Sequence, residues 1–70
     1  MERIQVKSSN IASIGYDEAS SILEVEFNSG DVYQYYDVPK GEYEGMMAAD
    51  SHGKYLNTAI KKGGYRYSKV

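Results

Sequence analysis

The ten residues from Gly30 to Pro39, GDVYQYYDVP, determine how the rest of the chain folds. They indicate a β-strand that is entered through a glycine turn and closed by a proline. Gly30 can adopt the positive φ that tight hairpin turns usually need, and Pro39 cannot donate a hydrogen bond to a neighbouring strand. Because side chains alternate along a strand, Tyr33 and Tyr35 share one face. The other face carries Val32, Gln34, Tyr36 and Val38.

The residues before Gly30 predict the strands that pair with this segment. In residues 22–27 apolar and acidic side chains alternate, which places Glu24 and Glu26 on the face opposite the core. A one-residue slip would bury both acids, so the register is well defined. A second strand spans residues 11–16, with one face formed by Ala12, Ile14 and Tyr16. Residues 3–7 alternate weakly and predict a short edge strand.

The residues after Pro39 predict two short helices. Residues 41–49 carry an apolar stripe at helical spacing, although Gly41 and Gly45 weaken this helix by roughly 1 kcal/mol each. Asp50 or Ser51 caps a second helix, which ends at Gly63-Gly64. Residues 65–69 alternate again and predict a short C-terminal edge strand. The expected fold is an α+β domain over residues 1–70: an antiparallel meander of three to four strands, with two helices packed on one face.

Composition excludes several kinds of site. The chain has no cysteine and a single histidine, His52, so a cysteine zinc site, a disulfide and a histidine-rich metal site are not expected. We expect no cofactor. No apolar run approaches the roughly 20 residues of a membrane span, and the first residues lack the apolar segment of a secretion signal. We therefore expect a cytoplasmic protein without membrane contact.

The charges are unevenly distributed. Residues 1–50 hold ten acids and three bases, whereas residues 51–70 hold five bases and no acid. Such a division favours a surface that meets an anion. The alternative is that the two halves neutralise each other in the fold. The five bases are Lys54, Lys61, Lys62, Arg66 and Lys69.

The chain resembles the KTSC domain family over residues 6–67. The motifs that carry the resemblance are Tyr16-Asp17, Leu23-x-Val25-x-Phe27, Gly30-x-x-Tyr33-x-Tyr35-x-x-Val38-Pro39 and Ala49-x-Ser51-x-Gly53-x-Tyr55-x-Asn57-x-x-Ile60. Leu56 departs from the pattern, because an aromatic residue is more usual before the asparagine. The family is named for a module at the carboxyl end of some lysyl-tRNA synthetases, and it also occurs as small bacterial and phage proteins. The resemblance implies a non-catalytic module, with RNA binding suggested by the attachment to a synthetase.

The basic residues alternate with rings near the C-terminus. Lys61, Lys62, Arg66 and Lys69 with Tyr65 and Tyr67 form the cationic and aromatic mixture that single-stranded nucleic acids favour. The alternative is a solvated helix end and tail. Tyr36 is a further candidate for stacking, but Glu24 and Glu26 share its face and would repel phosphate. Tyr33 and Tyr35 are either core rings or a stacking platform, and the core interpretation is favoured.

The segment Ser51-His52-Gly53-Lys54 forms a second candidate cluster. Free backbone N–H groups at a helix start, together with Lys54, can hold a phosphate. The alternative, which is more common, is an N-cap serine followed by a glycine that packs closely against a neighbour.

Two classes of function therefore compete. The first is an RNA-binding module that uses the C-terminal bases. The second is a protein-interaction module that uses the exposed ring of Tyr36 or an unpaired edge strand. An enzyme is not expected, because the chain lacks cysteine, has one histidine and contains no phosphate-binding loop of the G-x-x-x-x-G-K-[ST] type.

Overall fold

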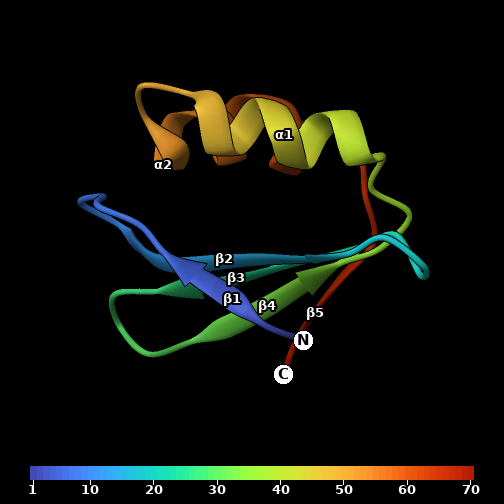
Figure 1. Cartoon of the computed structure of the whole chain (residues 1–70), viewed down its shortest axis with the longest axis horizontal. Coiled ribbons are helices and arrows are strands. Elements are labelled where there is room, and N and C mark those ends of the chain that lie inside the picture. The colour runs from blue at the N-terminus through green and yellow to red at the C-terminus, as the bar shows by residue number, and fades with distance from the viewer.

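The computed structural model describes residues 1–70, which form a five-stranded antiparallel meander and a helical layer (Figure 1). The strands are β1 (Arg3–Gln5), β2 (Ile11–Asp17), β3 (Ile22–Phe27), β4 (Val32–Tyr35) and β5 (Tyr67–Lys69). The helical segments are α1 (Lys40–Ala48), α2 (His52–Tyr55) and the π-helix η1 (Leu56–Lys61). The strand order follows the chain, from β1 at one edge to β5 at the other. The α+β class is confirmed, and the sheet has five strands because both predicted edge strands pair.

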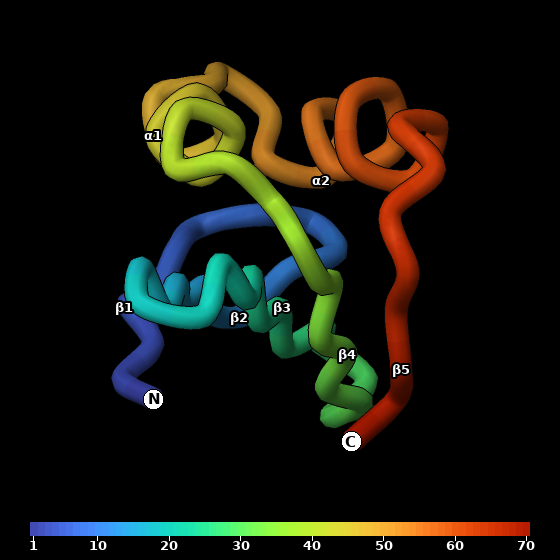
Figure 2. Tube along the Cα trace, turned by 90° about the vertical axis from the view of Figure 1, so that its right-hand side faces the viewer, coloured from blue at the N-terminus to red at the C-terminus, as the bar shows by residue number.

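The molecule has two layers, with all the helical segments on one face of the sheet (Figure 2). Both termini lie on the sheet side, away from the helices (Figures 1 and 2). The core between the layers contains nine buried residues: Ile11, Ile14, Leu23, Val25, Tyr35, Val38, Met46, Leu56 and Ile60. The predicted separation of faces in β3 is confirmed, because Leu23 and Val25 are in this core.

A β-bulge in β2 changes the predicted inward face of that strand. Ile11 pairs with Phe27 and Ser13 with Glu26, so Ala12 is an extra residue in the ladder. The bulge places both Ile11 and Ile14 in the core. Ala12 therefore does not share a face with Ile14, although the alternation predicts that it does. Burying isoleucine removes more apolar surface from water than burying alanine, which favours this arrangement.

The strand β4 ends at Tyr35, three residues before the predicted end at Val38. Asp37 has φ of 57°, a left-handed conformation that interrupts an extended strand. Aspartate tolerates this conformation better than most residues. The turn directs the chain across to α1, and Val38 enters the core on the way.

The second helix is capped as the sequence predicts, but its geometry changes within its length. The Ser51 hydroxyl accepts a hydrogen bond from the backbone N–H of Lys54, whereas residues 56–61 form wider π-helical turns. The Thr58 hydroxyl donates to the Lys54 carbonyl oxygen at 2.9 Å and so satisfies an acceptor of the helical ladder. Leu56 and Ile60, four residues apart, both face the core.

Gly45 allows the two helices to approach closely. A Cβ atom at this position would overlap the Tyr55 hydroxyl and lie 3.0 Å from the ring carbon that bears it. The glycine that weakens α1 intrinsically is therefore required for the packing of α1 against α2. This contact directs the Tyr55 hydroxyl to Glu42, to which it donates at 2.7 Å.

Candidate nucleic-acid interface

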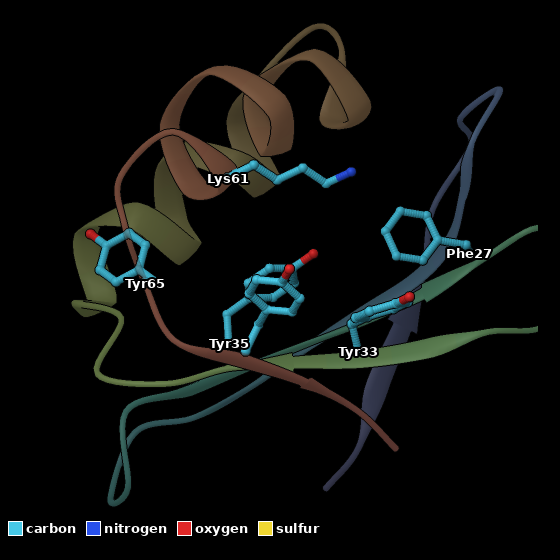
Figure 3. A pocket seen from close by; sticks show the side chains of 6 residues that line it. Phe27, Tyr33, Tyr35, Lys61 and Tyr65 are labelled. Atoms are coloured by element: carbon cyan, nitrogen blue, oxygen red, sulfur yellow. The ribbon is translucent and has the colours of Figure 1, made fainter.

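A pocket of about 390 Å³ opens between the end of η1 and the β4–β5 edge of the sheet (Figure 3). Its lining consists of five aromatic residues and one lysine: Phe27, Tyr33, Tyr35, Lys61, Tyr65 and Tyr67. Three of these, Lys61, Tyr65 and Tyr67, are residues that the sequence predicted to bind nucleic acid. The fold therefore brings part of the predicted site together with rings that belong to the sheet.

Strand pairing places the rings of β4 and β5 side by side. Tyr35 pairs with Tyr67 in the antiparallel register, and paired residues project from the same face of a sheet. The Tyr35 and Tyr67 ring centroids are 5.8 Å apart, and those of Tyr33 and Tyr67 are 6.2 Å apart. Phe27 meets Tyr33 edge-to-face at 5.8 Å. The tilted rings form a floor and one wall of the pocket rather than a closed stack.

For Tyr33 and Tyr35 the sequence left two interpretations open, core rings or a stacking platform, and the exposure of each ring distinguishes them. Tyr35 is 3% exposed and belongs to the core, whereas Tyr67 is 65% exposed. Tyr33 is half-buried between them. Burial, together with the neighbouring Tyr33 and Tyr67 hydroxyls, raises the pKa of the Tyr35 hydroxyl. The hydroxyl therefore keeps its proton at neutral pH.

Lys61 forms the opposite side of the pocket. Its ammonium nitrogen lies 5.7 Å from the centroid of the Phe27 ring, within the range of a cation–π contact. No carboxylate lies within ion-pair distance of this nitrogen. The pocket consequently carries one uncompensated positive charge.

Glu42 of α1 holds the remaining wall in place. It accepts hydrogen bonds from the hydroxyls of Tyr55 at 2.7 Å and Tyr65 at 3.4 Å. The hydrogen bond to Glu42, burial and the carboxylate charge raise the pKa of Tyr55, and burial followed by the same carboxylate raises that of Tyr65. The Tyr65 hydroxyl is turned from the pocket toward α1, and its ring closes the side of the pocket (Figure 3).

The five predicted cations are all exposed but differ in their partners. Arg66 contacts Asp37 at 3.0 Å and Lys69 contacts Asp31 at 3.2 Å. Such exposed pairs typically contribute about 0.2–1 kcal/mol, so a phosphate can displace these carboxylates. The cations without an ion-pair partner are Lys54, Lys61 and Lys62.

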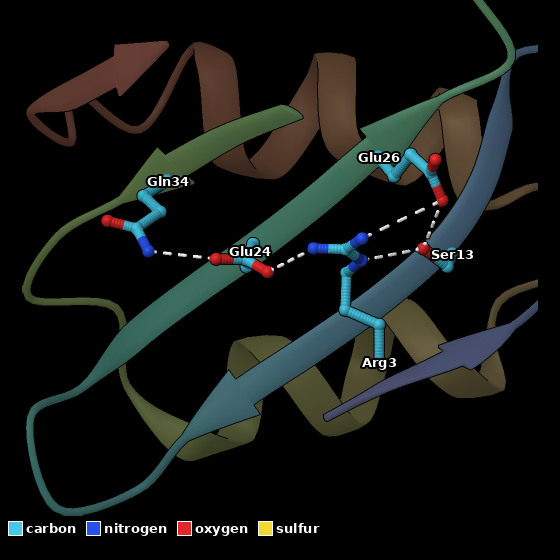
Figure 4. Close-up of polar contacts among 5 residues, drawn as sticks. All are labelled: Arg3, Ser13, Glu24, Glu26 and Gln34. Atoms are coloured by element: carbon cyan, nitrogen blue, oxygen red, sulfur yellow. Dashed lines mark hydrogen bonds and ion pairs between the residues drawn. The ribbon is translucent and has the colours of Figure 1, made fainter. Parts of the chain in front are cut away.

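Tyr36 lies on the other face of the sheet, apart from the pocket. Its hydroxyl donates to Gln34 at 3.3 Å, and the Arg66 guanidinium lies over its ring at 5.6 Å. Arg3 contacts Glu24 and Glu26 on this face, and Gln34 donates to Glu24 at 2.8 Å (Figure 4). The face is thus occupied by an internally bonded, acidic network.

In the segment Ser51–Lys54, the Ser51 hydroxyl and one ring nitrogen of His52 already have partners within the protein. The Ser51 hydroxyl accepts from the Lys54 backbone N–H at 3.2 Å, and His52 Nδ1 lies 2.8 Å from the Met46 carbonyl oxygen. Gly53 is buried, and a Cβ atom there would lie 3.4 Å from the Asn10 side chain. This geometry favours the N-cap interpretation over a phosphate site.

Three pocket residues, Phe27, Tyr33 and Tyr35, were not assigned to the candidate site by sequence reasoning. Alternation correctly put them on the inner face, where the sequence favoured a core role. The structure leaves Phe27 and Tyr33 only half-buried, so they line the pocket beside the buried Tyr35, and strand alternation alone does not predict how far a ring is covered.

Two other kinds of site have no counterpart in the structure. No group of three or more histidine, cysteine, aspartate or glutamate side chains is arranged to hold a metal ion. No helix combines the length and the apolar character that a bilayer crossing demands.

The model of the KTSC domain family matches residues 7–67. The chain belongs to the KTSC domain family. A KTSC domain protein from Yersinia pestis has a crystal structure that is 38% identical in sequence, with a TM-score of 0.93 over 99% of this chain and 96% of that one. The family resemblance expected from the sequence motifs is therefore confirmed.

Other relatives differ in how much of their length this chain matches. An uncharacterised protein of Stutzerimonas stutzeri is 41% identical over 70 residues, which is 100% of this chain and 99% of that protein. A lysine–tRNA ligase of Nostoc punctiforme is 31% identical over 67 residues, which is 96% of this chain but 12% of the ligase. A small part of that ligase is therefore similar to this KTSC domain.

Proposed function

We propose that this KTSC domain is a non-catalytic module that binds single-stranded or tRNA-like RNA through its C-terminal third. The observation that carries the proposal is the aromatic pocket with the unpaired ammonium group of Lys61 at its side. Single-stranded nucleic acids bind where exposed rings stack on bases and cations meet the backbone. The similarity to part of a lysine–tRNA ligase supports an RNA ligand.

The phosphate contacts are assigned to cations near the pocket. Lys62 follows Lys61 at the end of η1, and Lys69 pairs with Tyr33 in the register of β4 and β5. We place Lys54 and Arg66 at the periphery, because neither lines the pocket and Arg66 packs over Tyr36 on the other face. Of the candidate stacking rings, Tyr65 and Tyr67 remain in this interface, and Tyr36 does not.

Salt dependence tests the proposal. Neutralising three phosphates on a single strand gives a slope of log K against log salt of about −2, so binding weakens about 20-fold between about 50 mM and 200 mM salt. Fluorescence anisotropy with labelled tRNA and a labelled single-stranded RNA measures this. Lys62→Gln should reduce the slope by about 0.7, whereas Lys7→Gln, which removes another exposed charge elsewhere, should leave it unchanged. Absence of binding at the lower salt concentration would overturn the proposal.

A protein-interaction module is the second candidate. The observation that favours it is the free edge at β1, where Ile4 is 56% exposed beside a hollow lined by Met1, Tyr16 and Tyr43. A partner strand can pair with such an edge. A protein that remains bound after nuclease treatment and is lost with Ile4→Lys would support this candidate, whereas loss of all partners with nuclease would favour RNA.

A further inference from the structure

The Tyr35 hydroxyl is an unpartnered polar group in a buried residue. Tyr35 is 3% exposed, yet its hydroxyl makes no hydrogen bond within the protein, while four other tyrosine hydroxyls do. The hydroxyl is not sealed off from solvent, and it is directed toward the space between Lys61 and Phe27 (Figure 3). A tyrosine hydroxyl that reaches solvent and has no partner in the protein is free to donate to or accept from a ligand. This hydroxyl therefore marks a position where the pocket can hydrogen-bond a ligand.

The charge and shape of the pocket restrict that ligand. Lys61 is the only charged residue of the lining, so a ligand with a negative group is favoured over a neutral or cationic one. The accessible ring of Tyr67 and the tilted ring of Tyr33 present flat apolar faces, which suit a planar ring. The volume of about 390 Å³ is near the lower end for small-molecule pockets.

We propose that this pocket accepts a single unstacked nucleobase together with its 5′-phosphate. The base lies against Tyr67 and Tyr33, the Tyr35 hydroxyl bonds a polar atom on its edge, and Lys61 meets the phosphate. This inference deepens the proposed function and rests on it. It adds that the domain reads one nucleotide at a defined position, rather than only attracting a polyanion to its surface.

Mononucleotides provide the test, because they contain the base and phosphate without the rest of an RNA strand. Adenosine 5′-monophosphate, adenosine and ribose 5-phosphate are titrated into the full chain and followed by NMR chemical shifts. We expect the nucleotide to shift the signals of Tyr35, Lys61 and Tyr67, adenosine to bind more weakly, and ribose 5-phosphate to leave the rings unchanged. A short peptide ending in phenylalanine, which also joins a ring to a carboxylate, should bind more weakly than the nucleotide.

Three substitutions assign the contacts. Tyr35→Phe removes only the unpartnered hydroxyl, so it should weaken nucleotide binding several-fold without lowering the stability of the fold. Tyr36→Phe, which removes a hydroxyl on the other face, is the matched control and should not affect binding. Tyr67→Ser removes an exposed stacking ring and should weaken binding about 10-fold or more. Lys61→Met retains most of the apolar stem and should abolish the preference for nucleotide over nucleoside.

The outcomes separate this inference from the proposed function. RNA binding that persists with no shift at the pocket rings, or with unchanged affinity in Tyr35→Phe, would overturn the base pocket and leave the proposed function standing. Nucleotide binding in the pocket without any RNA binding would overturn the proposed function and leave the base pocket standing. Stronger binding of the phenylalanine peptide than of the nucleotide would overturn the nucleobase assignment and favour a protein ligand.

Discussion

A single carboxylate, Glu42, connects three helical or loop segments through the hydroxyls of Tyr55 and Tyr65. This contact depends on Gly45, because only a residue without a side chain leaves room for the Tyr55 ring against α1. The residue that appeared from its helix propensity to be a weakness is thus a packing requirement. Propensity concerns the helix alone, whereas the contact depends on residues that are distant in sequence.

The two glycines of α1 should therefore respond in opposite directions to the same substitution. Gly45→Ala places a methyl group on the Tyr55 hydroxyl and should destabilise the fold by about 1–3 kcal/mol, the usual cost of overpacking. Gly41 has open space around it, so Gly41→Ala should stabilise by about 0.5–1 kcal/mol. Urea unfolding followed by circular dichroism measures both changes. Equal effects of the same sign would contradict this account.

At the scale of elements, alternation and turn residues predicted most of the strands. Residues 22–27 gave a clear signal because their two faces differ sharply in polarity, and Gly30 does adopt positive φ, at 96°. The bulge at Ala12, the early end of β4 at Asp37 and the π-helical turns were not predictable. Each depends on how the element meets the opposite layer, and a local pattern does not contain that information.

Because β1 pairs with β2, Arg3 of β1 lies against Glu24 of β3. The stability of the fold should therefore depend on pH in the acidic range. Burial acts to raise the pKa of Glu24, but hydrogen bonds from Gln34 and Arg3, with the Arg3 charge, hold that pKa below its usual 4.5. The stabilisation that the ionised Glu24 provides is therefore complete above about pH 4.5. It is lost as the pH falls through the lower pKa that Glu24 has in the folded state.

The variant Glu24→Gln tests this dependence. At neutral pH it should lower the unfolding free energy by about 1–3 kcal/mol, because Arg3 loses its main partner. Its stability should then fall less than that of the native chain on acidification. Glu44→Gln, at an exposed position, serves as control and should retain the native acid response. A native-like loss of stability in Glu24→Gln would show that another carboxylate governs it.

At the scale of the whole molecule, the acidic and basic halves of the sequence are only partly matched in space. Arg66 and Lys69 reach aspartates next to β4, whereas Lys54, Lys61 and Lys62 have no such partner. The sequence predicted the composition of the basic group but not its division between two faces. That division follows from the pairing of β5 with β4, which turns Tyr67 inward and places Arg66 over Tyr36.

Three tyrosines spread across both layers should make the molecule sensitive to alkali. The pKa values of Tyr35, Tyr55 and Tyr65 are raised in the folded state. The stabilisation that these protonated hydroxyls provide is complete below the tyrosine pKa of the unfolded chain, about 10. It is lost as the pH rises through the higher pKa values of the folded state. Tyrosinate absorbance should thus show a late fraction that ionises together with unfolding measured by circular dichroism. A single transition of all tyrosines near pH 10, without unfolding, would contradict this expectation.

Both chain ends lie on the sheet side of the molecule, away from the helices (Figures 1 and 2). A polypeptide joined to Met1 would begin near β1, at the edge of the sheet opposite β5, whereas one joined to Val70 would begin three residues after Tyr67 of the pocket lining. A fusion tag for pocket studies therefore belongs at the amino terminus, at the far edge of the sheet from the aromatic rings.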